Sequence, residues 1–281
     1  MQSKTVVVTG GTSGIGEIAA LRLAQQGARI VLVARDRARA DATLAKLKSA
    51  NPSAAHSAHL ADLSAIAGMR RIATEIAAAE PRIDVLVNNA GAVFLSRQTS
   101  ADGLEMTFAT NHMAYFVVTN ILLPNLKATP GARIVSTASD AHKAGKLDFD
   151  DLQSQRSYSS FRAYGTSKLM NILFTRELAK RLADSGVTAN CLHPGFVGTR
   201  FGSNNAKGTF TRLLRNVVMS FGISPEEGAK TIVHLASSPD VATISGEYFY
   251  KCKIAEPSFA AQSDADAARL WEVSAKLAGV G

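Results

Sequence analysis

Cysteines and long apolar runs are both scarce in this sequence. Only two cysteines, Cys191 and Cys252, occur among the 281 residues. Two are too few for a disulfide framework, so a reducing cytoplasm is the expected compartment. No apolar run approaches the ~20 residues that a membrane-spanning helix requires. The first strand-like segment begins so near Met1 that it leaves no room for a signal peptide. We therefore expect a cytoplasmic protein without a membrane span.

The charge is basic but dispersed. The formal net charge is +8, with 46% hydrophobic and 19% charged residues, and no run of five or more basic side chains occurs. Disorder and nucleic-acid binding are therefore not expected, whereas a basic surface would attract anionic cofactors. The length fits a single domain over residues 1–281, large enough for a substantial core.

Residues 5–16 (TVVVTGGTSGIG) combine a β-branched run, a glycine-rich turn and the start of an apolar helix. A strand, a glycine turn and a helix together present helix N–H groups to a pyrophosphate. The spacing is G-x-x-x-G-x-G rather than G-x-G-x-x-G, so alone it also fits a plain turn between strand and helix. The residues expected to contact the cofactor here are Gly10, Thr12, Ser13, Gly14, Ile15 and Gly16.

Strand-like and helix-like segments then alternate along the chain. This order predicts an α/β fold, a doubly wound parallel sheet of the Rossmann type with about seven strands and helices on both faces. After the first strand we expect strands at 29–33, 55–60, 83–87, 133–137, 187–192 and 246–250. The main helices are expected at 37–51, 66–79, 104–123 and 164–182.

The end of the second strand is where such folds read the adenosine ribose. Ala34 occupies the position where an acidic residue would bind the 2′-hydroxyl, and Arg35 follows it. An arginine offers several donors to a 2′-phosphate, so the sequence favours NADP(H) over NAD(H). Asp36 favours NAD(H) instead, because its carboxylate could accept a hydrogen bond from a ribose hydroxyl.

Two further strand ends carry candidate cofactor contacts. Asp62 and Leu63 follow the third strand, and the fourth strand leads into the small and amide residues Asn89, Ala90 and Gly91. Such residues suit a site where the backbone approaches a ligand closely. No metal site is expected, because the only close histidine pair, residues 56 and 59, would point to opposite faces of a strand.

The centre of the chain carries four candidate catalytic residues. Asn111 lies inside a predicted helix, where asparagine is mildly unfavourable. Ser139 follows the fifth strand, and Tyr164 and Lys168 are four residues apart, so they share one helix face. An ammonium beside a phenol stabilises the phenolate, so we expect Lys168 to lower the pKa of Tyr164 from about 10 towards neutrality. Tyr164 would then be the acid/base, and Ser139 would hold the substrate oxygen.

The ordered set of motifs resembles the short-chain dehydrogenase/reductase family over nearly the whole chain. Within the family the chain is most similar to the retinol dehydrogenase group. That likeness rests on the turn at 34–36, the gap of 25 residues from Ser139 to Tyr164, and the tail at 268–274. Two positions depart from the family pattern: Ala114 stands where a glycine is expected, and Ala138 where a second serine is common. The matching motifs are TGxxxGxG at 9–16, NNAG at 88–91, Asn111, Ser139, YxxxK at 164–168 and HPG at 193–195.

The resemblance adds roles that the residues alone do not give. It implies that Lys168 also binds the nicotinamide ribose, and that Asn111 holds a water linking Lys168 to solvent. It also implies a homodimer or homotetramer, the usual assembly for such folds. The further cofactor contacts it implies are Tyr164 and Lys168 themselves, together with Pro194, Gly195, Val197 and Thr199.

Each candidate also has a purely structural reading. Tyr164 and Lys168 could be a surface pair, Ser139 a strand-end cap with Ser136 as the reacting serine, and Asn111 a buried polar residue or a cause of a helix kink. His193 is expected to be structural. Trp271 and Leu277, on the last helix, are expected in the core or an interface.

Residues 196–223 are rich in apolar side chains and are expected to form a substrate-binding lid, or else a helix packed on the core or on a partner subunit. The sequence as a whole predicts an NADP(H)-dependent oxidoreductase that interconverts an aldehyde or ketone with an alcohol, on a bulky apolar substrate. One alternative is a carbon–carbon double-bond reductase of the protochlorophyllide reductase type. The other is a non-catalytic NADP-binding sensor.

Overall fold

An eight-stranded sheet forms the centre of the computed structural model, which describes residues 1–196 and 223–279. The strand order is β3-β2-β1-β4-β5-β6-β7-β8, and every neighbouring pair is parallel except β7 and β8. The predicted doubly wound parallel sheet is confirmed, with one more strand than expected. The strands are β1 (Thr5–Thr9), β2 (Arg29–Ala34), β3 (Ser57–Leu60), β4 (Val85–Asn88), β5 (Arg133–Thr137), β6 (Thr188–Leu192), β7 (Tyr248–Tyr250) and β8 (Lys253–Ile254).

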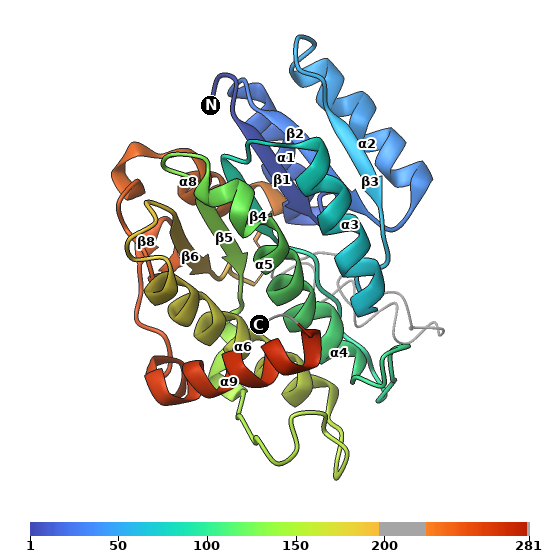
Figure 1. Ribbon diagram of the computed structural model, residues 1–281, viewed down its shortest axis with the longest axis vertical. Coiled ribbons are helices and arrows are strands. Elements are labelled where there is room, and N and C mark those ends of the chain that lie inside the picture. Colours follow the sequence, from blue (N-terminus) through green and yellow to red (C-terminus); the bar gives the residue numbers. More distant parts are fainter. Residues whose placement is uncertain (197–222, 280–281) are drawn as a thin grey trace.

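Helices cover both faces of the sheet (Figure 1). One layer holds α1 and α8 packed together, with α2 beside α1, and the other holds α3, α5 and α6. The last helix, α9, lies across α6 in Figure 1 and packs against it. Their bounds are α1 (Gly14–Gln25), α2 (Arg37–Ala50), α3 (Ile66–Ala79), α5 (Ala114–Lys127), α6 (Ser160–Arg181), α8 (Pro225–Ser237) and α9 (Asp264–Ala278).

The two faces of the sheet have separate hydrophobic cores. Val7 of β1 belongs to the core under α3, α5 and α6, whereas Val6 and Val8 belong to the core under α1 and α8. All three valines are fully buried. This is why the predicted strand reads as a continuous apolar run rather than as an alternating pattern.

The helix predicted at 104–123 is interrupted, and the prediction was wrong there. A short helix, α4 (Met106–Phe108), leads into a π-helical turn, Ala109–Met113, and α5 begins only at Ala114. A π-helical turn differs from an α-helix only in that each hydrogen bond spans one more residue. Over so few residues, the spacing of apolar side chains does not distinguish the two. Such turns often occur at functional sites, and this one contains Asn111.

The last helix is fixed to this turn through a buried histidine. The Nε2 atom of His112 lies 2.8 Å from Oγ of Ser274 on α9. Burial lowers the pKa of His112 to about 3, so its ring is neutral. Trp271, also on α9, packs against Phe116 and Phe174 with ring centres 4.9 and 5.8 Å away, as expected for a core residue. Leu277 is 38% exposed and is not part of that core.

Two of the remaining connections adjoin the functional edge of the sheet. The connection from β5 to α6 contains a 3₁₀ helix at Asp140–Ala144. The expected lid at 196–223 lies outside the described residues except for its two ends, where the Ile223 N–H donates to the Phe196 carbonyl at 2.8 Å. No helix in the described ranges combines the length and apolar character needed to cross a bilayer.

Candidate active site

The carboxyl ends of β1, β4, β5 and β6 meet at one edge of the sheet. The parallel register pairs Val8 with Val87, and further along it pairs Thr137 with Leu192. The segments that follow these strands therefore lie side by side. They carry the glycine turn after β1, the NNAG segment after β4, Ser139 after β5 and the HPG segment after β6.

The glycine turn lies against the NNAG segment backbone to backbone. Gly10 has a φ of +67°, and a Cβ there would come within 2.8 Å of the Ala90 Cα. A Cβ at Gly16 would lie 2.3 Å from Nδ2 of Asn89 and 2.4 Å from the Gly10 carbonyl. The Thr9 hydroxyl joins the two segments, accepting from the N–H groups of Asn89 at 3.0 Å and Ala90 at 3.1 Å. Side chains are excluded here because the two backbones are already in contact.

The first turn of α1 leaves its N-terminal end open to a ligand. Ser13 is the N-cap residue, but its side chain makes no capping hydrogen bond. The dipole of α1 and the N–H groups of Gly14, Ile15 and Gly16 favour an anion at this end. Thr12 is half-buried beside the exposed Ser13. An uncapped helix end beside a backbone cradle that admits no Cβ fits the pyrophosphate of a nicotinamide dinucleotide.

The structure separates Arg35 from Asp36. Arg35 is exposed directly after β2, whereas the Asp36 carboxylate caps α2 and accepts from the Arg39 N–H at 2.9 Å. The Asp36 carboxylate is therefore engaged in capping a helix, whereas the Arg35 side chain faces solvent. Asp62 and Leu63 follow the neighbouring strand β3. The Asp62 carboxylate accepts from the Ser64 N–H at 3.0 Å, and Leu63 is buried.

Ser139 and Tyr164 meet at the centre of the edge. The Ser139 side chain lies close enough to the Tyr164 phenol to lower its pKa. The Ser139 hydroxyl also accepts from the Ala141 N–H at 3.2 Å, so the serine caps the 3₁₀ helix while it contacts the tyrosine. Ser136 is fully buried within β5 and does not reach the edge. Ser139 is thus the serine that the fold presents to Tyr164.

Lys168 lies beneath this pair and is buried. Its Nζ donates to the Thr137 carbonyl at 3.0 Å, and it lies 5.7 Å from the centre of the Tyr164 ring and 5.6 Å from that of Tyr115. Burial lowers the pKa of Lys168 to about 7. Burial also raises the pKa of Tyr164 to about 12, an effect that the Ser139 side chain only partly opposes.

The expected acidification of Tyr164 by Lys168 is therefore not found in this structure. The prediction from sequence took Lys168 to be a fully charged ammonium. In the folded chain the same burial that would strengthen the attraction also disfavours the charge itself. Near neutral pH the pair therefore consists of a neutral Tyr164 phenol and a Lys168 amine that is only partly protonated.

Asn111 is fully buried, and both the oxygen and the nitrogen of its side-chain amide form hydrogen bonds with the protein. Its Oδ1 accepts from the Ala92 N–H at 2.8 Å, and its Nδ2 donates to the Ala92 carbonyl and to Oγ of Ser167, each at 3.0 Å. A Cβ on Gly91 would lie 3.3 Å from this Oδ1 and 3.6 Å from Nζ of Lys168. Asn111 thus anchors the segment after β4 to α6. Its role in holding a water near Lys168 stays a prediction.

The HPG segment is held by the imidazole of His193. Its Nδ1 accepts from the Gly195 N–H at 3.2 Å, and its ring stacks on Tyr250 with ring centres 4.0 Å apart. Gly195 has a φ of +92°, which explains the glycine after Pro194. This agrees with the structural role expected for His193. Val197 and Thr199 lie outside the described residues.

Two contacts near the site were missed from the sequence. Thr9 belongs to the predicted TGxxxGxG motif, but the sequence did not indicate that its hydroxyl joins the glycine turn to the NNAG segment. His142 contacts the Ser139 carbonyl, and nothing in its spacing indicates this, because the contact depends on the 3₁₀ turn. Among residues 1–196 and 223–279, no three potential metal ligands gather.

Comparison with known proteins identifies the class of protein that this fold and site define. The family model for short chain dehydrogenases matches residues 4–209. The chain therefore belongs to the short chain dehydrogenase family of oxidoreductases, which bind NAD(P).

Within that family the chain falls in the retinol dehydrogenase group. It is 40% identical to Retinol dehydrogenase 14 of Mus musculus, over 100% of this chain and 87% of that protein. It is also 40% identical to Retinol dehydrogenase 13 of Homo sapiens, over 99% of this chain and 85% of that one.

Solved structures share the fold. An uncharacterized protein from Mycobacterium paratuberculosis superposes with a TM-score of 0.78 at 29% identity, covering 99% of this chain and 94% of the other. A short chain dehydrogenase from Burkholderia cenocepacia, crystallised in complex with NADP, gives a TM-score of 0.68 at 27% identity, covering 88% and 96%.

Proposed function

We propose that this protein is an NADP(H)-dependent oxidoreductase that interconverts an aldehyde or ketone with an alcohol. The observation that carries the proposal is the meeting of Ser139 and Tyr164 beside the buried Lys168, at the edge that also holds the glycine turn. A nicotinamide dinucleotide bound at that edge would supply the hydride.

The side chains of the pair suit the reduction of a carbonyl. A pKa of about 12 keeps the Tyr164 phenol protonated near neutral pH, so it can donate a proton to a developing alkoxide. The Ser139 hydroxyl binds the same oxygen and orients it. Donation leaves a phenolate, and Lys168, on the same helix face with a pKa of about 7, can return a proton to it.

The preference for NADP(H) rests on the turn after β2. Arg35 is exposed where the adenosine end of the dinucleotide is expected, and the Asp36 carboxylate is held by the α2 backbone. A guanidinium attracts a 2′-phosphate and a carboxylate repels it. The solved Burkholderia cenocepacia relative, in complex with NADP, agrees with this preference.

The proposed substrate is bulky and apolar. Three large apolar side chains, Leu95, Phe161 and Phe196, are between 56% and 64% exposed. Leu95 follows the NNAG segment, Phe161 precedes Tyr164 on the same helix, and Phe196 directly follows Gly195. Exposed apolar side chains at a site mouth favour lipophilic ligands. The names of the retinol dehydrogenase relatives point to the same class.

NADPH oxidation measured across aldehydes and ketones of graded size and polarity tests the function. We expect turnover that rises with apolar bulk. A panel in which small polar carbonyl compounds, such as open-chain sugars, are the best substrates would contradict the substrate class. Reduction of an enone at its carbon–carbon bond, identified by product analysis, would instead support the double-bond reductase. Binding of NADPH without any turnover would support the sensor.

A further inference from the structure

His142 is a buried histidine outside the motifs that define the site. It lies in the 3₁₀ helix that begins at Ser139, and none of its surface is exposed. Its Nδ1 lies 2.7 Å from the Ser139 carbonyl oxygen, and its Nε2 lies 3.0 Å from the backbone N of Ser258. The ring therefore links the segment after β5 to a segment 116 residues further along the chain.

These two partners fix the tautomer of the ring. The Ser258 N–H can only donate, so Nε2 of His142 must be the unprotonated acceptor. The Ser139 carbonyl can only accept, so Nδ1 must carry the proton. Burial lowers the pKa of His142, in agreement with a neutral ring. A doubly protonated ring could not accept from Ser258.

The hydrogen bond from Nδ1 of His142 to the Ser139 carbonyl stabilises the turn that orients the Ser139 hydroxyl. The His142 N–H also donates to the Ser139 carbonyl, at 3.1 Å, and the Ala141 N–H donates to Oγ of Ser139 at 3.2 Å. The carbonyl and the hydroxyl of Ser139 are therefore held by consecutive parts of one turn. Rotation of that turn would move Oγ away from Tyr164.

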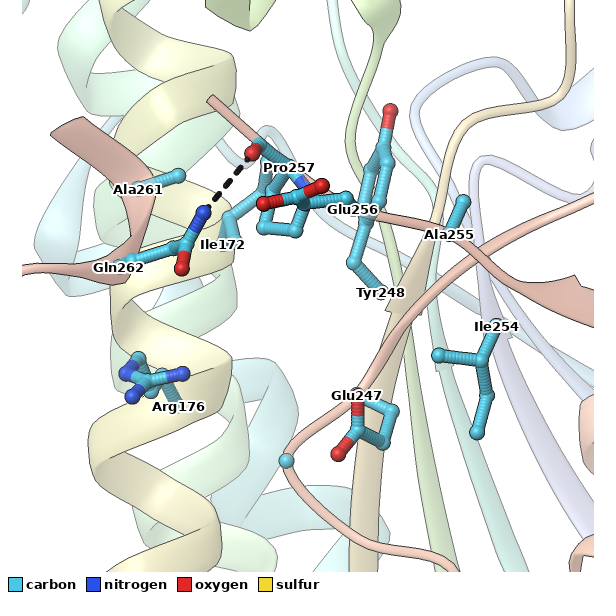
Figure 2. A pocket seen from close by; sticks show the side chains of 11 residues that line it. Ile172, Arg176, Glu247, Tyr248, Ile254, Ala255, Glu256, Pro257, Ala261 and Gln262 are labelled. Atoms are coloured by element: carbon cyan, nitrogen blue, oxygen red, sulfur yellow. Dashed lines mark hydrogen bonds between the residues drawn. The ribbon is translucent and has the colours of Figure 1, made fainter. Parts of the chain in front are cut away.

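On its other side, the His142 ring is bonded to the strap, which comprises residues 254–262 and begins at the last residue of β8. The strap forms one wall of a cavity of about 330 Å³, facing Ile172 and Arg176 of α6 (Figure 2). None of the proposed catalytic residues lines that cavity. The strap is held by the Ala255 N–H, which donates to the Tyr248 carbonyl at 2.8 Å, and by the side chain of Gln262, which donates to the Pro257 carbonyl at 3.2 Å. The Tyr248 ring also packs edge-on against His142.

We propose that His142 is a positioning residue for Ser139, acting as the Nδ1–H tautomer held between the strap and the Ser139 carbonyl. It takes no part in the reaction itself. The inference rests on the proposed function, because the serine it positions is the one that would bind the substrate oxygen. It makes the orientation of Ser139 depend on a segment from the far end of the chain.

Two conservative substitutions distinguish the hydrogen bond that His142 makes to Ser139 from the one it makes to Ser258. His142→Asn places an amide N–H near the position of Nδ1 and keeps the donor to Ser139. His142→Gln places an amide oxygen near the position of Nε2 and keeps only the acceptor for Ser258. We expect kcat for carbonyl reduction to fall about tenfold in H142Q and by less than about threefold in H142N, with KM for NADPH nearly unchanged in both.

His56→Gln is the matched control. Like His142, His56 is bonded to backbone, with Nδ1 accepting from the Ile30 N–H at 3.0 Å, but it is only partly buried and lies at the opposite end of β2 from Arg35. We expect H56Q to lower the melting temperature and leave kcat unchanged. Equal kcat values in H142N and H142Q, with melting temperatures lowered alike, would mean that His142 is only structural and would overturn the proposal.

A second measurement on the wild-type chain does not depend on activity. Long-range ¹H–¹⁵N spectra of the imidazoles, with H142N used for assignment, report which nitrogen of His142 carries the proton. We expect Nδ1–H, and an Nε2–H tautomer would overturn the proposal even if turnover were normal. Lack of turnover by the wild type on every carbonyl tested would count against the proposed function, while the tautomer would still decide the geometry on which the positioning role rests.

Discussion

Nζ of Lys168 lies 5.7 Å from the centre of the Tyr164 ring, one helical turn away, and gives a hydrogen bond to the Thr137 carbonyl. The lysine is thus fixed to the end of β5, the strand that also delivers Ser139. Two elements that are distant in sequence, β5 and α6, are joined at the reacting groups. The relative position of serine, tyrosine and lysine is therefore set by the sheet rather than by the helix alone.

Removing the phenol oxygen should stop the reaction without loosening the site. We expect Tyr164→Phe to lower kcat at least about a hundredfold, because the phenol is the proposed proton donor. NADPH binding, followed by quenching of Trp271 fluorescence or by calorimetry, should change little. Tyr158→Phe removes a phenol that donates to the Phe94 carbonyl instead and is the control. Normal turnover by Y164F would contradict the mechanism.

Burial of Lys168 should make stability rise with pH. In the unfolded chain the amine titrates near pH 10.4, whereas in the folded chain its pKa is about 7. Between these values the unfolded state holds a proton that the folded state does not, so raising the pH favours folding. We expect the free energy of unfolding of the cofactor-free protein to increase from about pH 7 to about pH 9, relative to Lys168→Met.

Urea unfolding at several pH values in that window checks this prediction. Lys180→Met, on the exposed part of the same helix, should keep the wild-type slope. Identical slopes in the wild type and in K168M would show that Lys168 stays charged in the folded chain.

Cofactor preference should depend on Arg35. We expect Arg35→Ala to raise KM for NADPH about tenfold or more and to leave KM for NADH nearly unchanged, because only the former has a phosphate for the guanidinium to bind. Arg37→Ala, exposed in the first turn of α2, is the matched control. Equal use of NADH and NADPH by the wild type would remove the basis of this assignment.

The link between α9 and the π-helical turn should contribute measurably to stability. Ser274→Ala leaves Nε2 of the buried His112 without its hydroxyl partner. We expect the free energy of unfolding to fall by about 1–3 kcal/mol. Thermal or urea unfolding measures this, and Ser237→Ala on α8, whose hydroxyl bonds the Val233 carbonyl within its own helix, is the comparison. No difference between the two variants would mean that the His112 contact is replaced by another.

Sequence periodicity was sufficient where one pattern ran without interruption. The helix at Ile66–Ala79 and the strand at Arg133–Thr137 have the predicted bounds, since each is bordered by turn residues and buries one consistent face or run. β8 has only two residues, too few to show any period. The π-helical turn was missed because its five residues are too few for periodicity to distinguish it from an α-helix.

For the site, the sequence identified which side chains gather but not their ionisation. Ser139, Tyr164 and Lys168 are together as predicted. The direction of the Tyr164 pKa shift could not be predicted, because it depends on how deeply both groups are buried. The contact between His142 and the strap joins residues 116 positions apart in the sequence, and no local pattern indicates it.

The carboxylate of Asp36 begins α2 and stands beside the proposed phosphate contact. Substitutions at position 36 will therefore alter the folding of a helix and the charge seen by a dinucleotide at the same time. Engineering that aims to exchange one nicotinamide coenzyme for the other is better directed at residues 34 and 35. There the charge can be changed while the helix cap stays in place.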